Sequence, residues 1–173
     1  LIRPLLEDSQ KVTAVYGGGF KPPTKGHFDL VKKALKEMPE IDDLIIYVGG
    51  GVRDGITQEQ SMAIWEVYQE VLGPKVQIKP SDQPIRDVMR YVKDHPDELI
   101  YFLVGYREGR QDDLKDITSR TKGVEEKYSN LKVKVITSSE TDMSGTNARK
   151  SLQKGDKGTF FTYLPVEVPT NEK

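Results

Sequence analysis

The sequence contains no cysteine and only two histidines, His27 and His95, among its 173 residues. Disulfides and thiolate metal sites are therefore excluded, and a transition-metal centre is disfavoured, although oxygen ligands for magnesium remain plentiful. No apolar run approaches the roughly 18 residues that span a bilayer. The first residues lack a basic flank followed by a sustained apolar region, so we expect no signal peptide and a cytoplasmic location, with which the lack of cysteine is compatible.

The chain also lacks an excess of charge of either sign. It has 26 basic and 27 acidic residues, for a net charge of −1. Nothing in this balance favours nucleic acid or a membrane surface, so we expect neither as a partner, and any anion site must be built locally. With 36% hydrophobic and 31% charged residues, the chain suits a single domain with a core. We expect an N-terminal extension over 1–11, one domain over 12–165 and a C-terminal tail over 166–173.

Short apolar runs alternate with helical patterns along the whole chain. The apolar runs predict strands at 11–16, 43–49, 75–79, 98–105 and 132–137. The helical patterns predict helices at 26–38, where Phe28 is expected to face the core, and at 57–73, 84–95 and 145–155, with a further helical turn or two at 159–165. Thr57, with Gln60 three residues later, predicts a capping box at the start of the second helix, and Gly73 before Pro74 predicts its end. This alternation is typical of an α/β fold of the Rossmann-like, doubly wound kind, with a mainly parallel five-stranded sheet and helices on both faces. Ligands of such folds bind at the carboxyl edge of the sheet, where the strand order reverses.

A glycine- and proline-rich stretch follows the first predicted strand at that edge. Gly17–Gly19 lie between a strand and a helix, which suits a backbone that approaches phosphates. The stretch is neither a GxGxxG loop nor a P-loop, because Phe20 and Lys21 follow the glycines and no Gly-Lys-Ser/Thr ends it. What remains is the pattern G-x-F-x-P-x-T-x-G-H, made by Gly18, Phe20, Pro22, Thr24, Gly26 and His27.

This pattern resembles the first signature of the nucleotidyltransferase superfamily, which includes cytidylyltransferases, pantetheine-phosphate adenylyltransferase and nicotinamide-nucleotide adenylyltransferases. The family motif ends in (H/T)xGH, and TKGH at 24–27 is its threonine form. A second stretch, MSGTNAR at 143–149, resembles the family's ISSTxxR signature, from which Met143 and Gly145 depart. A weaker match is LVGYREGR at 103–110, which ends a predicted strand with glycine where the family contacts the base and ribose.

The resemblance implies an enzyme in which a substrate phosphate attacks the α-phosphorus of a nucleoside triphosphate, bound with Mg²⁺, and expels pyrophosphate. Positioning and charge stabilisation would then carry catalysis. We expect three catalytic residues: His27 as donor to the α-phosphate, Lys21 as a neutralising charge and Arg149 as a clamp on the β- and γ-phosphates. The expected nucleotide-binding residues are Gly18, Gly19, Phe20, Thr24, Gly26, His27, Gly105, Arg107, Ser144, Gly145, Thr146 and Arg149. No residue is expected to bind a metal directly.

The donor, the acceptor and turnover itself stay open at this point. ATP is the preferred donor, because the threonine form of the first motif together with an ISSTxxR-like second motif resembles the motifs of adenylyltransferases. CTP is the alternative donor. Pantetheine phosphate, nicotinamide mononucleotide and sugar or polyol phosphates are all possible acceptors, and the resemblance allows a homo-oligomer. A nucleotide-binding module without turnover is a second interpretation, since Gly145 replaces a serine. A fragment of a class I aminoacyl-tRNA synthetase is disfavoured by the short chain, which lacks a KMSKS-like run and a basic stripe.

Several conspicuous residues have ordinary structural interpretations. Ser144 and Thr146 suit N-caps as well as phosphate ligands. Arg53 is expected in solvent. For Arg107 and Arg110, contact with the nucleotide and a surface position are equally weighted interpretations. An expected solvated helix face holds Asp112, Asp113 and Asp116. His95 is expected to be structural, and an expected core cluster at helical spacing holds Met62, Trp65 and Tyr68.

Overall fold

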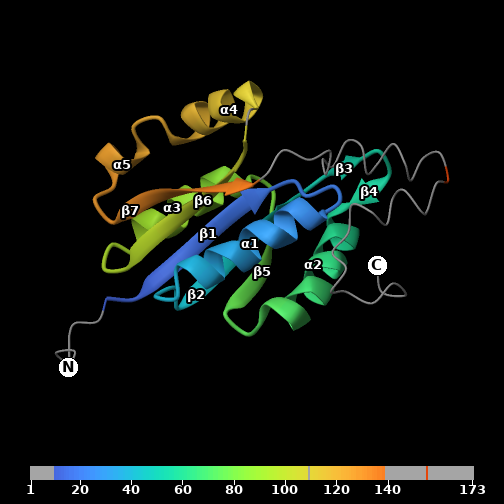
Figure 1. Cartoon of the computed structure of the whole chain (residues 1–173), viewed down its shortest axis with the longest axis horizontal. Helices are drawn as coiled ribbons and strands as arrows, with labels where there is room; N and C mark the ends of the chain where they lie inside the picture. The colour runs from blue at the N-terminus through green and yellow to red at the C-terminus, as the bar shows by residue number, and fades with distance from the viewer. Residues whose placement is uncertain (1–9, 109, 139–154, 156–173) are drawn as a thin grey trace.

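A five-stranded parallel sheet forms the centre of the molecule (Figure 1). A computed structural model describes residues 10–108, 110–138 and 155. The sheet has the order β5-β2-β1-β6-β7 and consists of β1 (Val12–Gly18), β2 (Asp43–Gly49), β5 (Val76–Ser81), β6 (Leu99–Arg107) and β7 (Leu131–Ser138). The helices are α1 (Lys25–Glu37), α2 (Gln58–Leu72), α3 (Pro84–Asp94), α4 (Gln111–Thr121) and α5 (Val124–Lys127). The expected Rossmann-like α/β fold is confirmed.

The strand order reverses next to β1. The chain first places β2 and β5 on one side of β1, and then returns to place β6 and β7 on the other side, with all neighbouring strands parallel. The carboxyl ends of β1 and β6 therefore diverge into loops that leave the sheet in opposite directions. This is the point of a doubly wound sheet at which a crevice for a ligand forms.

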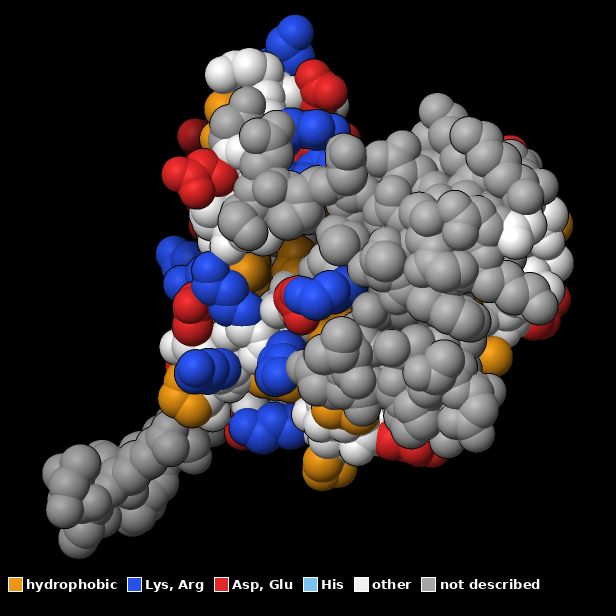
Figure 2. Space-filling model, turned by 45° about the vertical axis from the view of Figure 1, so that its right-hand side comes forward, with side chains coloured by type: hydrophobic (Ala, Val, Ile, Leu, Met, Phe, Trp, Pro, Cys, Tyr) orange, Lys and Arg blue, Asp and Glu red, His pale blue; other side chains and the backbone are white. Residues whose placement is uncertain are grey.

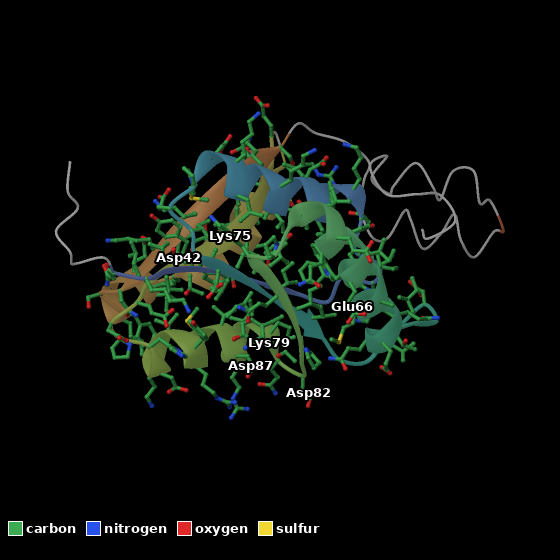
Figure 3. All side chains as sticks on the ribbon, turned by 90° about the horizontal axis from the view of Figure 1, so that it is seen from below. Asp42, Glu66, Lys75, Lys79, Asp82 and Asp87 are labelled. Carbon is green, nitrogen blue, oxygen red and sulfur yellow. The ribbon has the colours of Figure 1, made fainter. Side chains whose placement is uncertain are left out.

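The sheet has a hydrophobic core on each face. In Figure 3, α1 and α2 lie on one side of the sheet and α3 on the other. The first core buries Phe28 of α1 with Trp65 and Tyr68 of α2, as the sequence predicted. The second core buries Val88 and Val92 of α3 against the other face. The central strands β1, β2 and β6 are covered on both faces and are mostly apolar, as in other parallel sheets.

The ends of α2 follow the local sequence signals. Thr57 precedes the helix, its N–H donates to Oε1 of Gln60 at 2.9 Å, and its Oγ1 accepts from the N–H of Gln60 at 3.1 Å. This is the predicted capping box, which satisfies two backbone N–H donors at once. Gly73 ends the helix with φ at +105°, a value that favours glycine. Both predicted boundaries of this helix are confirmed.

Three local features differ from the sequence predictions. Gly17 and Gly18 belong to β1 and do not lie in the loop after it, because β2 pairs with β1 as far as Gly18. A small hairpin of β3 (Val52–Arg53) and β4 (Ile56–Thr57) was not predicted, since two-residue strands carry no periodicity. Asp54 and Gly55 make its turn with φ of 52° and 84°, as such tight turns require. Helix α4 was expected only as a solvated face.

The C-terminal predictions lie outside the described part of the chain. The predicted helix at 145–155 is described only at Gly155, and the helical turns predicted at 159–165 are not described. Among the described residues, no helix is long and apolar enough to cross a membrane.

Candidate functional site

A cavity of about 500 Å³ opens at the carboxyl edge of the sheet, where the strand order reverses. Its walls come from the ends of β1, β6 and β7, from α1 as far as Lys33, and from the side of α4 that carries Asp113 and Ile117. Charged residues of both signs line it, namely Asp29, Lys33, Arg107, Asp113 and Asp116. Figure 2 shows Lys and Arg side chains interspersed with Asp and Glu side chains on one face of the molecule.

The structure brings most of the described candidate residues to this cavity. The candidates that line it are Gly18, Gly19, Phe20, Thr24, Gly26, His27, Gly105 and Arg107. Lys21 is the described candidate that does not line it. Four candidates lie outside the described residues, and their roles stay predictions: Ser144, Gly145, Thr146 and Arg149.

The glycines at the ends of β1 and β2 allow a close approach of two backbones. A Cβ on Gly49 would lie 3.1 Å from Cα of Gly19 and 3.3 Å from the carbonyl oxygen of Gly18. A Cβ on Gly18 would lie 3.1 Å from the ring of Phe20. Such distances are tighter than most Cβ contacts, so a side chain at either position requires its neighbours to shift. Packing between neighbouring loops is thus a reason for glycine here, in addition to the predicted approach of a nucleotide.

Phe20 is the buried centre of the loop that follows β1. Its ring makes edge contacts with Tyr16, His27 and Trp65, at centroid distances of 5.1, 4.9 and 5.2 Å. Its φ of 50° lies in the left-handed region, which a bulky residue occupies only where its surroundings impose it. Phe20 is only 6% exposed, so it borders the cavity with little of its surface. At the cavity its ring contacts the His27 ring.

Lys21 lies beneath the loop, and its side chain is buried. Its Nζ donates to the carbonyl oxygens of Gly19 and Gly49, both at 2.7 Å, and so ties the end of β1 to the end of β2. Burial lowers the pKa of its ammonium group, an effect that Glu59 opposes. The geometry gives Lys21 a structural task at the loop, and its predicted neutralisation of a phosphate stays a prediction.

His27 is fixed at the start of α1 by a hydrogen bond to the preceding turn. Its Nδ1 accepts from the backbone N–H of Thr24 at 2.9 Å and lies 3.2 Å from Oγ1 of the same residue. Burial, together with the positive charge of Arg107, lowers the pKa of His27 to about 4. The ring is therefore neutral near pH 7, and since Nδ1 accepts, its proton is assigned to Nε2. His27 thus offers a neutral N–H donor in the wall of the cavity.

Arg107 faces the same cavity from the end of β6 and is held there by Asp113 of α4. Its Nε donates to Oδ2 of Asp113 at 2.9 Å, its NH2 nitrogen to Oδ1 at 2.7 Å, and its backbone N–H to Oδ2 at 2.8 Å. These bonds with Arg107 lower the pKa of the Asp113 carboxyl group. The expectation that Asp113 lies on a solvated helix face is wrong, because its side chain is only 13% exposed.

Sequence reasoning missed several other residues of the cavity. Lys33 lines it from α1 and donates from Nζ to the carbonyl oxygen of Thr137 at 2.7 Å, which ties α1 to the end of β7. Leu30 and Ile117 supply apolar wall. The one available signal was the helical spacing of Leu30 and Lys33 after His27, which places them on adjoining parts of one helix face.

The sequence matches no protein-family model. No curated protein matches it either. The structure, in contrast, resembles Plasmodium falciparum nicotinic acid mononucleotide adenylyltransferase complexed with APC, with a TM-score of 0.63 and 19% sequence identity. The alignment covers 91% of this chain and 92% of that one. At this identity the likeness establishes the fold, which both chains share over nearly their full lengths.

Proposed function

We propose that the protein is a nucleotidyltransferase that transfers a nucleoside monophosphate to a phosphorylated small molecule and releases pyrophosphate. The preferred donor is ATP. The observation that carries the proposal is the state of His27, a neutral N–H donor fixed by Thr24 in the wall of a cavity at the switch point of the sheet. The likeness to an adenylyltransferase structure supports the same class of reaction.

The reaction needs no general base. A phosphate acceptor is already ionised near pH 7, so one of its oxygens attacks the α-phosphorus directly. A new P–O bond forms to the acceptor, and the bond between the α-phosphorus and the α,β-bridging oxygen breaks. The electron pair leaves with pyrophosphate, whose charge Mg²⁺ bound to the triphosphate would neutralise. The protein contributes position and stabilisation of negative charge, which are the main sources of catalysis in phosphoryl-type transfers.

In this reaction His27 would donate from Nε2 to a non-bridging oxygen of the α-phosphate. The start of α1, where His27 is the third residue, adds the positive end of a helix dipole. Arg107 would add a guanidinium group from the end of β6, and its pairing with Asp113 limits the motion of that group.

Magnesium would arrive with the triphosphate. Within the described residues, no three His, Asp or Glu side chains gather into a group that could hold a metal ion. Asp113 and Asp116 line the cavity, but the carboxylate of Asp113 is engaged by Arg107. The described chain therefore suits a metal–nucleotide complex as substrate, with the ion bound chiefly by phosphate oxygens and water.

The test is pyrophosphate release with Mg²⁺, each of the four nucleoside triphosphates, and a panel of phosphorylated acceptors. The panel includes pantetheine phosphate, nicotinate and nicotinamide mononucleotides, and sugar and polyol phosphates. Release that depends on ATP and one acceptor supports the proposal in full. Release with CTP alone assigns a cytidylyltransferase in its place. Nucleotide binding without release for any pair contradicts the proposal and leaves a binding module.

A further inference from the structure

Helix α2 contacts the loop after β1 with three buried side chains. Ser61, Trp65 and Tyr68 are at most 1% exposed and follow one another at intervals of four and three residues. This spacing places them on one face of α2, the face turned toward α1 and the loop after β1 (Figure 1). None of them lines the cavity.

Two of these side chains hold carbonyl groups of the loop. Oγ of Ser61 donates to the carbonyl oxygen of Phe20. The hydroxyl group of Tyr68 donates to the carbonyl oxygen of Pro23 at 2.9 Å. All four groups are buried, so each hydrogen bond would leave an unsatisfied group if one partner were removed.

The third side chain packs against the ring of Phe20. The Trp65 and Phe20 rings meet edge to face at a centroid distance of 5.2 Å, and the Phe20 and His27 rings do so at 4.9 Å. The ring of Phe20 thus contacts both the indole of α2 and the imidazole at the cavity. A shift of Phe20 changes the surroundings of His27 directly.

The conformation of Phe20 itself needs this support. Its φ of 50° is unfavourable for a bulky side chain and persists only where neighbouring contacts over-determine it. Ser61 holds the carbonyl group of this same residue. Tyr68 holds the loop three residues later, immediately before Thr24, whose N–H donates to His27.

We propose that Ser61 and Tyr68 are positioning residues, which fix the loop after β1 so that Phe20 and Thr24 hold the His27 ring at the cavity. They touch neither substrate nor cavity and act through the loop backbone. For its kinetic consequence, this inference rests on the proposed function. Its consequence for the environment of His27 does not.

The test compares Ser61→Ala and Tyr68→Phe with Gln69→Ala. Gln69 lies on the same helix, but its side chain donates to the carbonyl oxygen of Val76 in β5. The control therefore also removes a side-chain hydrogen bond of α2, away from the loop. Thermal melting measures how much stability each of the three variants loses, so that their effects can be compared at similar stability. If Ser61→Ala does not fold, Tyr68→Phe, which keeps the ring, carries the test alone.

The decisive readout is NMR titration of the two histidines. Loss of the Ser61 or Tyr68 hydrogen bond loosens Phe20 and admits water to His27, so its pKa should rise by about one unit or more toward its ordinary value. Gln69→Ala should leave it unchanged. The other charged groups at the cavity, unchanged in all variants, are Asp29, Lys33, Arg107, Asp113 and Asp116.

With an active donor–acceptor pair, kcat should fall about 10- to 100-fold in Ser61→Ala and Tyr68→Phe, because small misplacements of catalytic groups are costly. Gln69→Ala should keep kcat within about 3-fold of wild type, as expected of a change away from the site. Variants that lose stability but keep both the wild-type His27 titration and kcat overturn the inference. If the wild type turns over no substrate, the proposed function fails, and the His27 titration alone decides the inference.

Discussion

Replacing His27 by asparagine or glutamine separates the two nitrogen atoms of the imidazole. Asparagine places an oxygen near the position of Nδ1, so His27→Asn keeps the acceptor for the Thr24 N–H and removes the donor. Glutamine reaches the position of Nε2, so His27→Gln keeps a donor and loses that acceptor. The proposal predicts that His27→Asn lowers kcat about 10²- to 10³-fold, the usual cost of one charge-stabilising donor.

Stability should change in the opposite order. His27→Gln leaves the N–H of Thr24 without its partner, and Thr24 is only 1% exposed. An unsatisfied buried donor costs about 1–2 kcal/mol of the free energy of unfolding. His27→Asn should therefore unfold near the wild-type urea midpoint at pH 7, and His27→Gln at a lower one. A His27→Asn protein with normal kcat would remove the Nε2 donor from the mechanism.

A comparison of the wild type with His27→Asn tests the protonation state of His27. Its pKa is about 4 in the folded protein and 6.5 ordinarily, so the unfolded chain binds more protons between these values. The free energy of unfolding then decreases as pH falls from about 6.5 to about 4, by about 2 kcal/mol at pH 5 as an upper limit for a ring in a cavity wall. His27→Asn lacks this loss but shares all carboxylates. Equal decreases from pH 7 to pH 5 in urea unfolding of the two proteins would refute the burial argument.

Three further changes test other parts of the account. Arg149→Ala should weaken nucleoside triphosphate binding by about 10-fold or more, as loss of a charge-assisted clamp does, and calorimetry with an unchanged Kd would contradict its assignment. Asp113→Asn should lower the free energy of unfolding by about 1–2 kcal/mol, because it breaks the pair with Arg107, whereas exposed Asp112→Asn, its matched control, should change it little. Gly49→Ala should melt at a lower temperature than wild type, since its Cβ would meet Gly19 at 3.1 Å, and equal melting would show that the two loops yield freely.

The sequence predicted the features that depend on local signals. The capping box of Thr57 and Gln60 and the glycine stop at Gly73 are short-range patterns, and the structure confirms both. The alternation of apolar runs with helical periodicity indicated the sheet and the edge at which the cavity lies. The sequence alone therefore placed the glycine- and proline-rich loop at the correct edge of the sheet.

Features that depend on contacts between distant residues were not predictable in this way. Asp113 looked like one acid among several on a polar helix, and only the fold of α4 against β6 places it on Arg107. The contact of the Lys21 ammonium group with the carbonyl oxygen of Gly49, 28 residues away, has no local sequence pattern, and the phosphate role of Lys21 stays a prediction. Ser61 had no pattern of its own, because its partner is a backbone carbonyl group 41 residues earlier.

The proposed enzyme transfers the α-phosphorus of its nucleotide, so a nucleotide labelled at that atom tests the proposal. The wild type and His27→Asn are incubated with Mg²⁺ and ATP labelled at the α-phosphorus, with each phosphorylated acceptor in turn. The account predicts that the wild type moves the label onto one acceptor and releases unlabelled pyrophosphate, and that His27→Asn does so at least about 10²-fold more slowly. Label that stays in ATP with every acceptor, or that appears in ADP with release of phosphate, would contradict it.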